Sequence, residues 1–261
     1  MDIDVMPAAF IGHGSPANAF ETNRYTAAWR QFGQSIPRPR AVLAISAHWF
    51  IHATAVTAMA KPRTIHDFFG FPPEYFAFEY PAPGDPGLAA EVSRLADPTW
   101  VGLDQDSWGL DHGTWSVLHH LFPAADVPVV QLSINAAQPA SYHLALGTSL
   151  APLRHQGILV LASGNIVHNL GLLDPSRAER GFAWAERFDE AARAILTDGS
   201  AEEFVDLEHH PDYQRCVPTP DHYFPALYLA GLAAAADERA SVLVDGYALG
   251  SLSMTSYTLG A

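Results

Sequence analysis

Apolar stretches of strand length recur along the chain, and segments with helical spacing lie between them. Most apolar runs are continuous rather than alternating, which is typical of strands buried on both faces of a parallel sheet. These runs cover residues 7–12, 41–47, 127–134, 157–163 and 241–245. The helical patterns cover residues 22–32, 86–95, 113–121, 139–155, 181–196 and 222–236. This alternation predicts one α/β domain over residues 1–261, with a central, mostly parallel sheet flanked by helices on both faces.

One segment interrupts this alternation. Residues 61–86 read KPRTIHDFFGFPPEYFAFEYPAPGDP and are rich in proline, glycine and aromatic residues. Their prolines exclude a continuous helix or a central strand. Loops of this length in compact domains are usually functional lids or binding loops. The segment is either a wall against a flat apolar ligand or a surface excursion held by its own aromatic cluster, and we predict that it borders the mouth of an active site.

Composition and charge narrow the class of protein. Hydrophobic residues make up 49% of the chain and charged residues 16%, a balance that excludes disorder for most of its length. With 28 acidic and 14 basic residues, the net charge of −14 disfavours nucleic acid and acidic membranes as partners. No apolar run approaches the roughly 20 residues of a membrane span, and the N-terminus Met1-Asp2-Ile3-Asp4 is unlike a signal peptide. We therefore expect a cytoplasmic protein, and whether it forms a homo-oligomer is left open.

Cysteine and histidine usage points to the type of chemistry. The single cysteine, Cys216, excludes an internal disulfide framework and a multi-cysteine metal cluster. The 13 histidines nearly equal all the lysines and arginines together. Histidine is the commonest metal ligand and the usual acid or base near neutral pH. The composition therefore indicates metal or acid–base chemistry.

Three histidines stand at the ends of predicted strands. His13 lies in the turn GHGSP, His48 ends the second strand in SAHW, and His168 follows a later strand in SGNIVHN. Ligands of open parallel sheets bind outside the carboxyl ends of the strands. One strand-end histidine is most often structural, but three together favour a common site.

Two further histidines stand at predicted helix starts. His222 follows Asp221, which we expect to cap the helix, and the helix dipole would then favour the neutral, metal-binding imidazole. His112 precedes another helix in the sequence WGLDHG. Each is alternatively a partly buried residue without a chemical role, and His66 within the aromatic segment is ambiguous.

Taken in order, these segments resemble the class III extradiol ring-cleavage dioxygenases, in their 4,5-DOPA dioxygenase branch. The similarity runs from about residue 7 to residue 256. The motifs that carry it are GHGSP at 12–16, SAHW at 46–49, TIHDF at 64–68, YPAPG at 80–84, WGLDHG at 108–113, VVQLSI at 129–134, ASGN at 162–165, VHN at 167–169, PDHY at 220–223 and GSLSM at 250–254. Several linked motifs in one order are far more specific than any of them alone.

The resemblance implies a non-haem Fe(II) enzyme that uses O2 to open a catechol ring next to its two hydroxyls. It implies His13 and His48 as the first two metal ligands and His222 as the third, where the protocatechuate branch has a glutamate. Because the usual oxygenase set is two histidines and one carboxylate, three neutral histidines make Zn(II) an alternative occupant.

The resemblance also implies roles for the remaining candidates. His168 would be the catalytic acid and base, and His112 the second histidine of the pocket. His66 and Tyr75 in the aromatic segment would contact the substrate. No arginine stands in a motif that marks a carboxylate anchor, so the sequence does not identify the catechol.

The expected function is therefore a metal-dependent extradiol dioxygenase acting on a small catechol. The alternative is a zinc-dependent hydrolase on the same scaffold, because a bound metal activates water as readily as it positions O2. A non-catalytic protein that binds metal or phenolics is a third interpretation. It is disfavoured because His112 and His168 exceed what metal capture needs.

Overall fold

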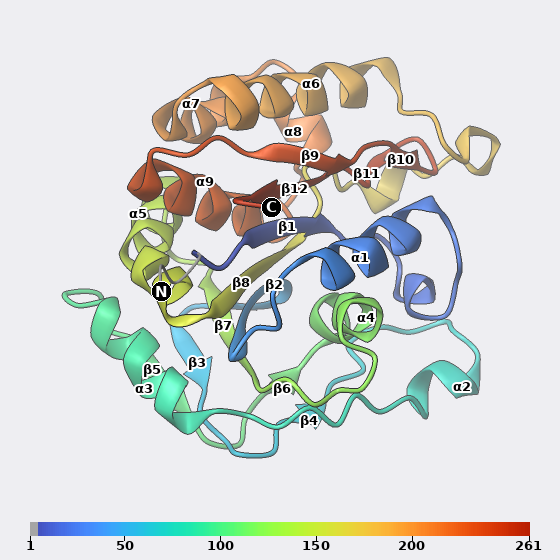
Figure 1. Cartoon of the computed structure of the whole chain (residues 1–261). Helices are drawn as coiled ribbons and strands as arrows, with labels where there is room; N and C mark the ends of the chain where they lie inside the picture. Colours follow the sequence, from blue (N-terminus) through green and yellow to red (C-terminus); the bar gives the residue numbers. More distant parts are fainter. Residues whose placement is uncertain (1–4) are drawn as a thin grey trace.

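The computed structural model of the protein describes residues 5–261. The acidic N-terminus, on which the expectation of no signal peptide rests, lies outside the described residues. An eight-stranded sheet forms the centre of the molecule, in the order β5-β3-β7-β2-β8-β1-β12-β9 (Figure 1). Its four middle strands run parallel to one another and are β7 (Val129–Asn135), β2 (Ala41–Ile51), β8 (Ile158–Gly164) and β1 (Ala8–Gly12). The predicted α/β class with a central parallel sheet is confirmed.

The edges of the sheet are mixed in direction. On one side β12 (Ser256–Leu259) pairs antiparallel with β1, and β9 (Ser241–Val244) pairs antiparallel with β12. On the other side β3 (Ala55–Thr57) is antiparallel to β7, and β5 (Gly102–Asp104) is parallel to β3. Two small ladders lie outside the sheet, joining β4 (Arg63–Thr64) to β6 (Gly109–Leu110) and β10 (Tyr247–Ala248) to β11 (Leu252–Ser253).

Helices cover both faces of the sheet. They are α1 (Arg24–Ser35), α2 (Pro73–Phe76), α3 (Pro86–Leu95), α4 (His112–Leu121), α5 (Ala140–Leu150), α6 (Ala183–Asp198), α7 (Ala201–Asp206), α8 (Tyr213–Cys216) and α9 (Phe224–Ala236). Short 3-10 helices cover Pro16–Ala19, Ala151–Gln156, Leu170–Leu172, Pro175–Arg177 and Leu207–His209. None of the helices within residues 5–261 has both the length and the apolar character that a membrane span requires.

Alternate residues of β2 contribute to two apolar cores, one on each face of the sheet. In β2, Leu43 and Ile45 join the apolar core formed with α3, α5, α6, α7 and α9. Val42 and Ala44 point to the opposite face and join the core formed with α1 and α4. Figure 1 shows α1 and α4 on one side of the sheet, with α5 and α9 on the other. Because both faces are covered, residues 41–45 of the strand are apolar at every position, as the sequence indicates.

Helix α9 begins later than the sequence predicts. Tyr223 precedes its first residue, and no side chain caps its first turn. Asp221 does not cap the helix, so that prediction is wrong. Its carboxylate instead lies 2.5 Å from Nδ1 of His222. The tight chain reversal before α9 allows this contact, and His222 therefore lies outside the helix.

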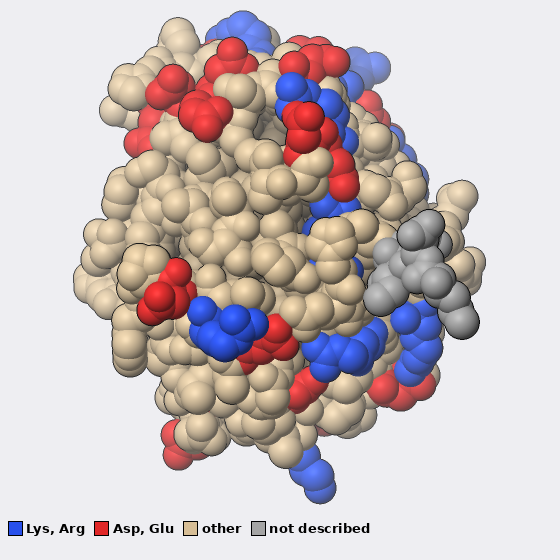
Figure 2. Space-filling view, turned by 60° about the vertical axis from the view of Figure 1, so that its left-hand side comes forward, with Lys and Arg blue, Asp and Glu red and all other residues tan. Residues whose placement is uncertain are grey.

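The surface carries charges of both signs side by side. Figure 2 shows acidic and basic side chains interspersed on one face of the molecule. Several basic residues pair with acids, as Arg38 does with Asp126 at 2.9 Å.

Candidate active site

Five histidines from distant parts of the chain meet beside the carboxyl ends of the central strands. His13 follows β1, His48 lies near the end of β2, His112 begins α4, His168 follows β8 and His222 precedes α9. Their rings form a compact cluster, in which the rings of His48 and His222 are also 5.0 Å apart. The His112 ring centroid is 3.8 Å from that of His48, His48 is 5.1 Å from His13, His13 is 5.4 Å from His222, and His222 stacks on His168 at 3.5 Å.

Hydrogen bonds fix which ring nitrogen of His13 is free. Its Nδ1 lies 3.0 Å from Oγ of Ser163, and that hydroxyl donates to the carbonyl oxygen of Gly113 at 2.6 Å. Because the hydroxyl proton is used there, the Ser163 oxygen accepts the proton of His13 Nδ1. His13 Nε2 is therefore left with its lone pair toward the cluster. The contact of Asp221 with Nδ1 of His222 leaves Nε2 of that ring free in the same way.

Asp67 links two of the five rings. Its Oδ2 lies 2.8 Å from Nδ1 of His48, and its Oδ1 accepts hydrogen bonds from Nδ1 and the backbone amide of His112, both at 3.0 Å. Burial alone would raise the pKa of Asp67, but its contacts with His112 and His48 outweigh burial and hold that pKa well below its usual range. An ionised carboxylate therefore orients both rings through Nδ1 and leaves both Nε2 atoms available.

Electrostatics keeps most of the cluster neutral. Burial, followed by repulsion from the neighbouring histidines, lowers the pKa of His13 and of His222 well below the ordinary value. Burial is also the main cause that lowers the pKa of His112 and of His168 to about 4. Burial lowers the pKa of His48 as well, but the contact with Asp67 outweighs it and raises that pKa. Neutral imidazoles with exposed lone pairs are the form that binds cations.

The shortest contact inside the cluster tests whether a metal ion fits. Nε2 of His13 lies 3.1 Å from Nε2 of His48. Both rings have Nδ1 directed at an acceptor, so their Nε2 atoms face each other, and a bound cation would take the place of any proton that the raised pKa of His48 keeps on its Nε2. One ion bound about 2.1 Å from each nitrogen would satisfy both lone pairs. One ligand atom from each of His13, His48 and His112 also lies within 4.8 Å of the other two, so the donor set fits a metal ion.

A glycine is required beside these rings. A Cβ at Gly113 would lie 2.5 Å from Oγ of Ser46 and 2.9 Å from Cδ2 of His48. Asp111 fixes the start of α4 against β2. It caps the helix through the Thr114 amide at 3.2 Å and accepts a hydrogen bond from Ser46 at 2.6 Å. The sequence WGLDHG therefore lets the start of α4 pack directly against the ring of His48.

A cavity of about 390 Å³ opens onto four of the histidines. Its lining residues are Gly14, Ser15, Pro16, His48, Asp67, Phe68, Phe69, Phe71, His112, His168, Leu170, Leu173, His222, Leu249 and Leu252. Asp67 and three phenylalanines come from segment 61–86. The prediction that this segment borders the site is confirmed.

The two predicted substrate contacts in this segment lie elsewhere. Nε2 of His66 is 2.8 Å from the carbonyl oxygen of Phe78, and its ring packs 6.0 Å from that of Trp115. The ring of Tyr75 packs 4.6 Å from Phe20 and 5.3 Å from Phe71. Among the described residues, neither His66 nor Tyr75 lines the cavity. The walls are formed instead by neighbouring phenylalanines.

Sequence reasoning missed Asp67, although one signal was present. It is the only acid between Lys61 and Phe71 in an otherwise aromatic stretch. Its partner His112 is 45 residues away, however, so only the folded chain identifies the contact.

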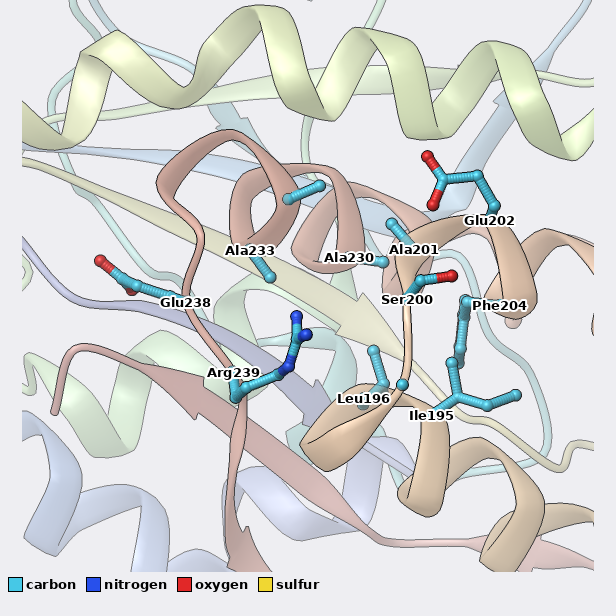
Figure 3. Close-up of a pocket in the computed structure, with 12 residues that line it drawn as sticks. Ile195, Leu196, Ser200, Ala201, Glu202, Phe204, Ala230, Ala233, Glu238 and Arg239 are labelled. Atoms are coloured by element: carbon cyan, nitrogen blue, oxygen red, sulfur yellow. The ribbon is translucent and has the colours of Figure 1, made fainter.

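A second hollow is unrelated to the histidine cluster. Figure 3 shows this pocket of about 270 Å³, with lining residues from the end of α6, the start of α7 and the end of α9. Ser200 caps α7 through the amide of Glu203, and Glu238 pairs with Arg154 at 3.0 Å. These two groups already have partners, and no histidine lines this pocket.

The α/β fold, the clustered histidines that can hold a metal ion and the apolar cavity beside them together indicate a metal-dependent enzyme. The family model described as the catalytic LigB subunit of aromatic ring-opening dioxygenase matches residues 10–260. The chain is 46% identical over 258 residues to a protein of Escherichia coli (strain K12) named 4,5-DOPA dioxygenase extradiol, covering 98% of this chain and 95% of that protein. A Beta vulgaris protein of the same name is 36% identical, over 95% of this chain and 94% of that one.

A solved structure agrees with these matches. The crystal structure of an uncharacterised protein from Escherichia coli K12 superposes with a TM-score of 0.84 at 42% identity, covering 97% of this chain and 99% of the other. The chain belongs to the LigB family of class III extradiol dioxygenases, and it is an aromatic ring-opening dioxygenase. The resemblance drawn from the sequence motifs is confirmed, and the hydrolase and non-catalytic alternatives are left without support.

Proposed function

We propose that this enzyme opens the ring of a catechol with O2, next to the two hydroxyls, as a dioxygenase of the 4,5-DOPA type. The observation that carries the proposal is the cluster of histidines at the base of an aromatic-walled cavity. The names of the relatives from Escherichia coli and Beta vulgaris support the same type of substrate. We expect the enzyme to act in the cytoplasm on this small molecule, without nucleic acid or membrane partners.

In this proposal, His13, His48 and His222 hold one Fe(II) ion through Nε2. His112 is the rival third ligand, because one ligand atom from each of His13, His48 and His112 lies within 4.8 Å of the other two, a set in which His222 does not appear. Zn(II) is an alternative occupant of an all-histidine set. The bound metal would supply proximity between catechol and O2 and stabilise the developing negative charge.

His168 is the proposed proton carrier. Its ring lines the cavity and stacks face to face on that of His222. The backbone of His168 is held on two sides, because its amide donates to the Cys216 carbonyl at 2.9 Å and it bridges to Leu252. A fixed imidazole in this place can accept the proton of a catechol hydroxyl and return it when the ring opens.

His112 and the cavity walls complete the proposed machinery. With Nδ1 held by Asp67, His112 presents the lone pair of Nε2 and can accept a hydrogen bond there from a hydroxyl of the substrate. Phe68, Phe71 and Leu252 line the cavity beside it and exclude water from the reacting groups.

Oxygen consumption tests the reaction. The purified protein is loaded with Fe(II) under anaerobic conditions and mixed with catechols in an oxygen electrode. We expect one O2 to be consumed per ring opened, with a yellow product, and we expect chelation to stop uptake until Fe(II) is restored. If no member of a broad catechol panel causes O2 uptake by protein that contains one iron per chain, the proposal is wrong.

We predict that Asp67→Asn weakens metal binding. Asparagine cannot accept hydrogen bonds from both His48 and His112, and its amide group would turn a donor toward one of them. Loss of such an outer partner typically costs roughly 10- to 100-fold in metal affinity or activity. Competition with a chromophoric chelator measures the affinity. Asp126→Asn, which removes an exposed ion pair with Arg38, should leave it unchanged.

A further inference from the structure

We propose that Asp189, a buried acid outside the histidine cluster, is a positioning residue that fixes His168 beside the cavity. It acts through residues 251–255, which donate hydrogen bonds to its carboxylate and also pair with the backbone around His168. This inference rests on the proposed role of His168 as proton carrier.

The burial of Asp189 is the first observation. The buried residues of α6 are Trp184, Ala185, Phe188, Asp189, Ala192 and Leu196, and one of these six is an acid. Asp189 is 2% exposed. Burial of an acid among apolar side chains costs free energy unless hydrogen bonds offset it. Buried polar groups of this kind can fix one arrangement of the chain at some cost in stability.

Two hydroxyls of one short segment supply the hydrogen bonds. Ser253 donates to one oxygen of Asp189 at 2.6 Å, and Thr255 donates to the other at 2.8 Å. Among residues 5–261 no ion pair includes Asp189, and Arg193, one turn further along α6, pairs with Asp245 at 3.2 Å. The carboxylate of Asp189 therefore holds the chain at two alternate positions just after Leu252.

The backbone of the same segment pairs with the chain on either side of His168. The amide of Ser253 donates to the carbonyl oxygen of Val167 at 2.9 Å, and the amide of Asn169 donates to the carbonyl oxygen of Ser251 at 3.1 Å. These two hydrogen bonds flank His168. A shift of residues 251–253 would therefore carry the backbone of His168 with it.

The position of His168 affects the chemistry more than the binding of metal. Its ring lines the cavity, and Leu252, its bridge partner, lines the cavity as well. The proposed metal ligands have supports of their own, because Ser163 holds Nδ1 of His13 and Asp221 holds Nδ1 of His222. A proton carrier must lie within hydrogen-bond reach of the hydroxyl that it serves. A misplaced His168 should therefore lower kcat while iron remains bound.

Asp189→Asn tests the proposal in the Fe(II)-loaded protein. Asparagine keeps one acceptor oxygen and turns an amide group toward Ser253 or Thr255. A misplacement of about 1 Å can cost roughly 10²-fold in rate, so we expect kcat for O2 uptake to fall about ten- to hundredfold. Iron content and the anaerobic dissociation constant for a catechol should stay near the wild-type values.

Matched variants keep this test decisive. Ser253→Ala and Thr255→Ala each remove one of the two hydrogen bonds to Asp189 and should lower kcat in the same direction by a smaller factor. Glu190→Gln alters the next residue of α6, whose side chain is 71% exposed, and should leave kcat unchanged. If the Asp189, Ser253 and Thr255 variants all keep the wild-type kcat, the proposal is wrong.

A double-mutant cycle distinguishes positioning from general support of the fold. Asp189→Asn is combined with His168→Gln, which lacks the proton carrier. If Asp189 acts through His168, its substitution should lower kcat by no more than about twofold in that background. The same fold-loss in both backgrounds would show that Asp189 does not act through His168, and would overturn the proposal.

Amide hydrogen exchange gives a readout that does not depend on turnover. In Asp189→Asn, peptides that cover residues 166–170 and 251–255 should exchange about tenfold faster or more, because their mutual hydrogen bonds open more often. Peptides from β2 and the Glu190→Gln variant should match the wild type. Unchanged exchange in Asp189→Asn would overturn the proposal. If the wild type opens no catechol, the dioxygenase proposal fails, and the exchange rates still decide whether Asp189 holds the His168 segment.

Discussion

Replacement of His13, His48 or His222 by alanine is expected to remove tightly bound metal from the protein. His13 and His222 are buried and His48 is partly buried, and each has its Nδ1 held by a hydroxyl or carboxylate partner, so Nε2 is directed at the cluster. Loss of a direct ligand should cost more than the roughly 10- to 100-fold that loss of an outer partner costs. Metal content per chain, measured after dialysis against a weak chelator, gives the result.

The same measurement on His112→Ala decides between the two ligand sets. If His112→Ala keeps a full equivalent of metal while the other three variants lose it, the set is His13, His48 and His222. If His112→Ala loses metal and His222→Ala keeps it, His112 is the third ligand. His155→Ala, which alters an exposed histidine, controls for the purification. Retention of a full equivalent by every single variant would show that the cluster is not the metal site.

The central fold could be predicted because its strands are buried on both faces. Strands β2, β7 and β8 lie between two helical layers, and every residue of β7 and β8 is buried. A largely apolar run is therefore the signal that remains in the sequence, although β7 also buries Gln131, Ser133 and Asn135. Strand β12 has only four residues, with the sequence SYTL. All four are buried, but the serine and the threonine are polar, so the sequence does not indicate a buried strand. Its place beside β1 follows from tertiary pairing, which local sequence does not show.

The histidines of the candidate site could be predicted from the sequence, because the parallel sheet fixes where strand ends lie. His13, His48 and His168 are near the ends of parallel strands, and the fold brings such ends to one edge. The roles of acids were harder to predict, because they depend on contacts across the chain or on the path of a short turn. Asp67 reaches His112 from a loop, and Asp221 contacts His222 where a helix cap was expected. Local propensity favours the cap, but the backbone before α9 places the carboxylate at the ring.

His168→Gln is expected to keep the metal and bind catechol but turn over far more slowly. Glutamine has similar bulk and can form a hydrogen bond, but it cannot carry a proton near neutral pH. Loss of a general acid or base typically lowers the rate roughly 10²- to 10⁴-fold. Iron content, the anaerobic dissociation constant for a catechol and the rate of O2 uptake are measured on the same preparation. His155→Gln should match the wild type in all three.

The three measurements separate the roles open to His168. Its ring stacks on that of His222 at 3.5 Å, close enough that a fourth ligand is the competing role. Loss of iron in His168→Gln would identify that role and indicate a closed, zinc-type site without a free position for substrate. Near-normal turnover with full iron would exclude both roles. A slow variant with intact iron and catechol binding would leave proton transfer, because His168 then affects only the step in which the ring opens. In that case added imidazole should restore part of the rate to His168→Ala, since the deletion leaves room for a free base beside His222.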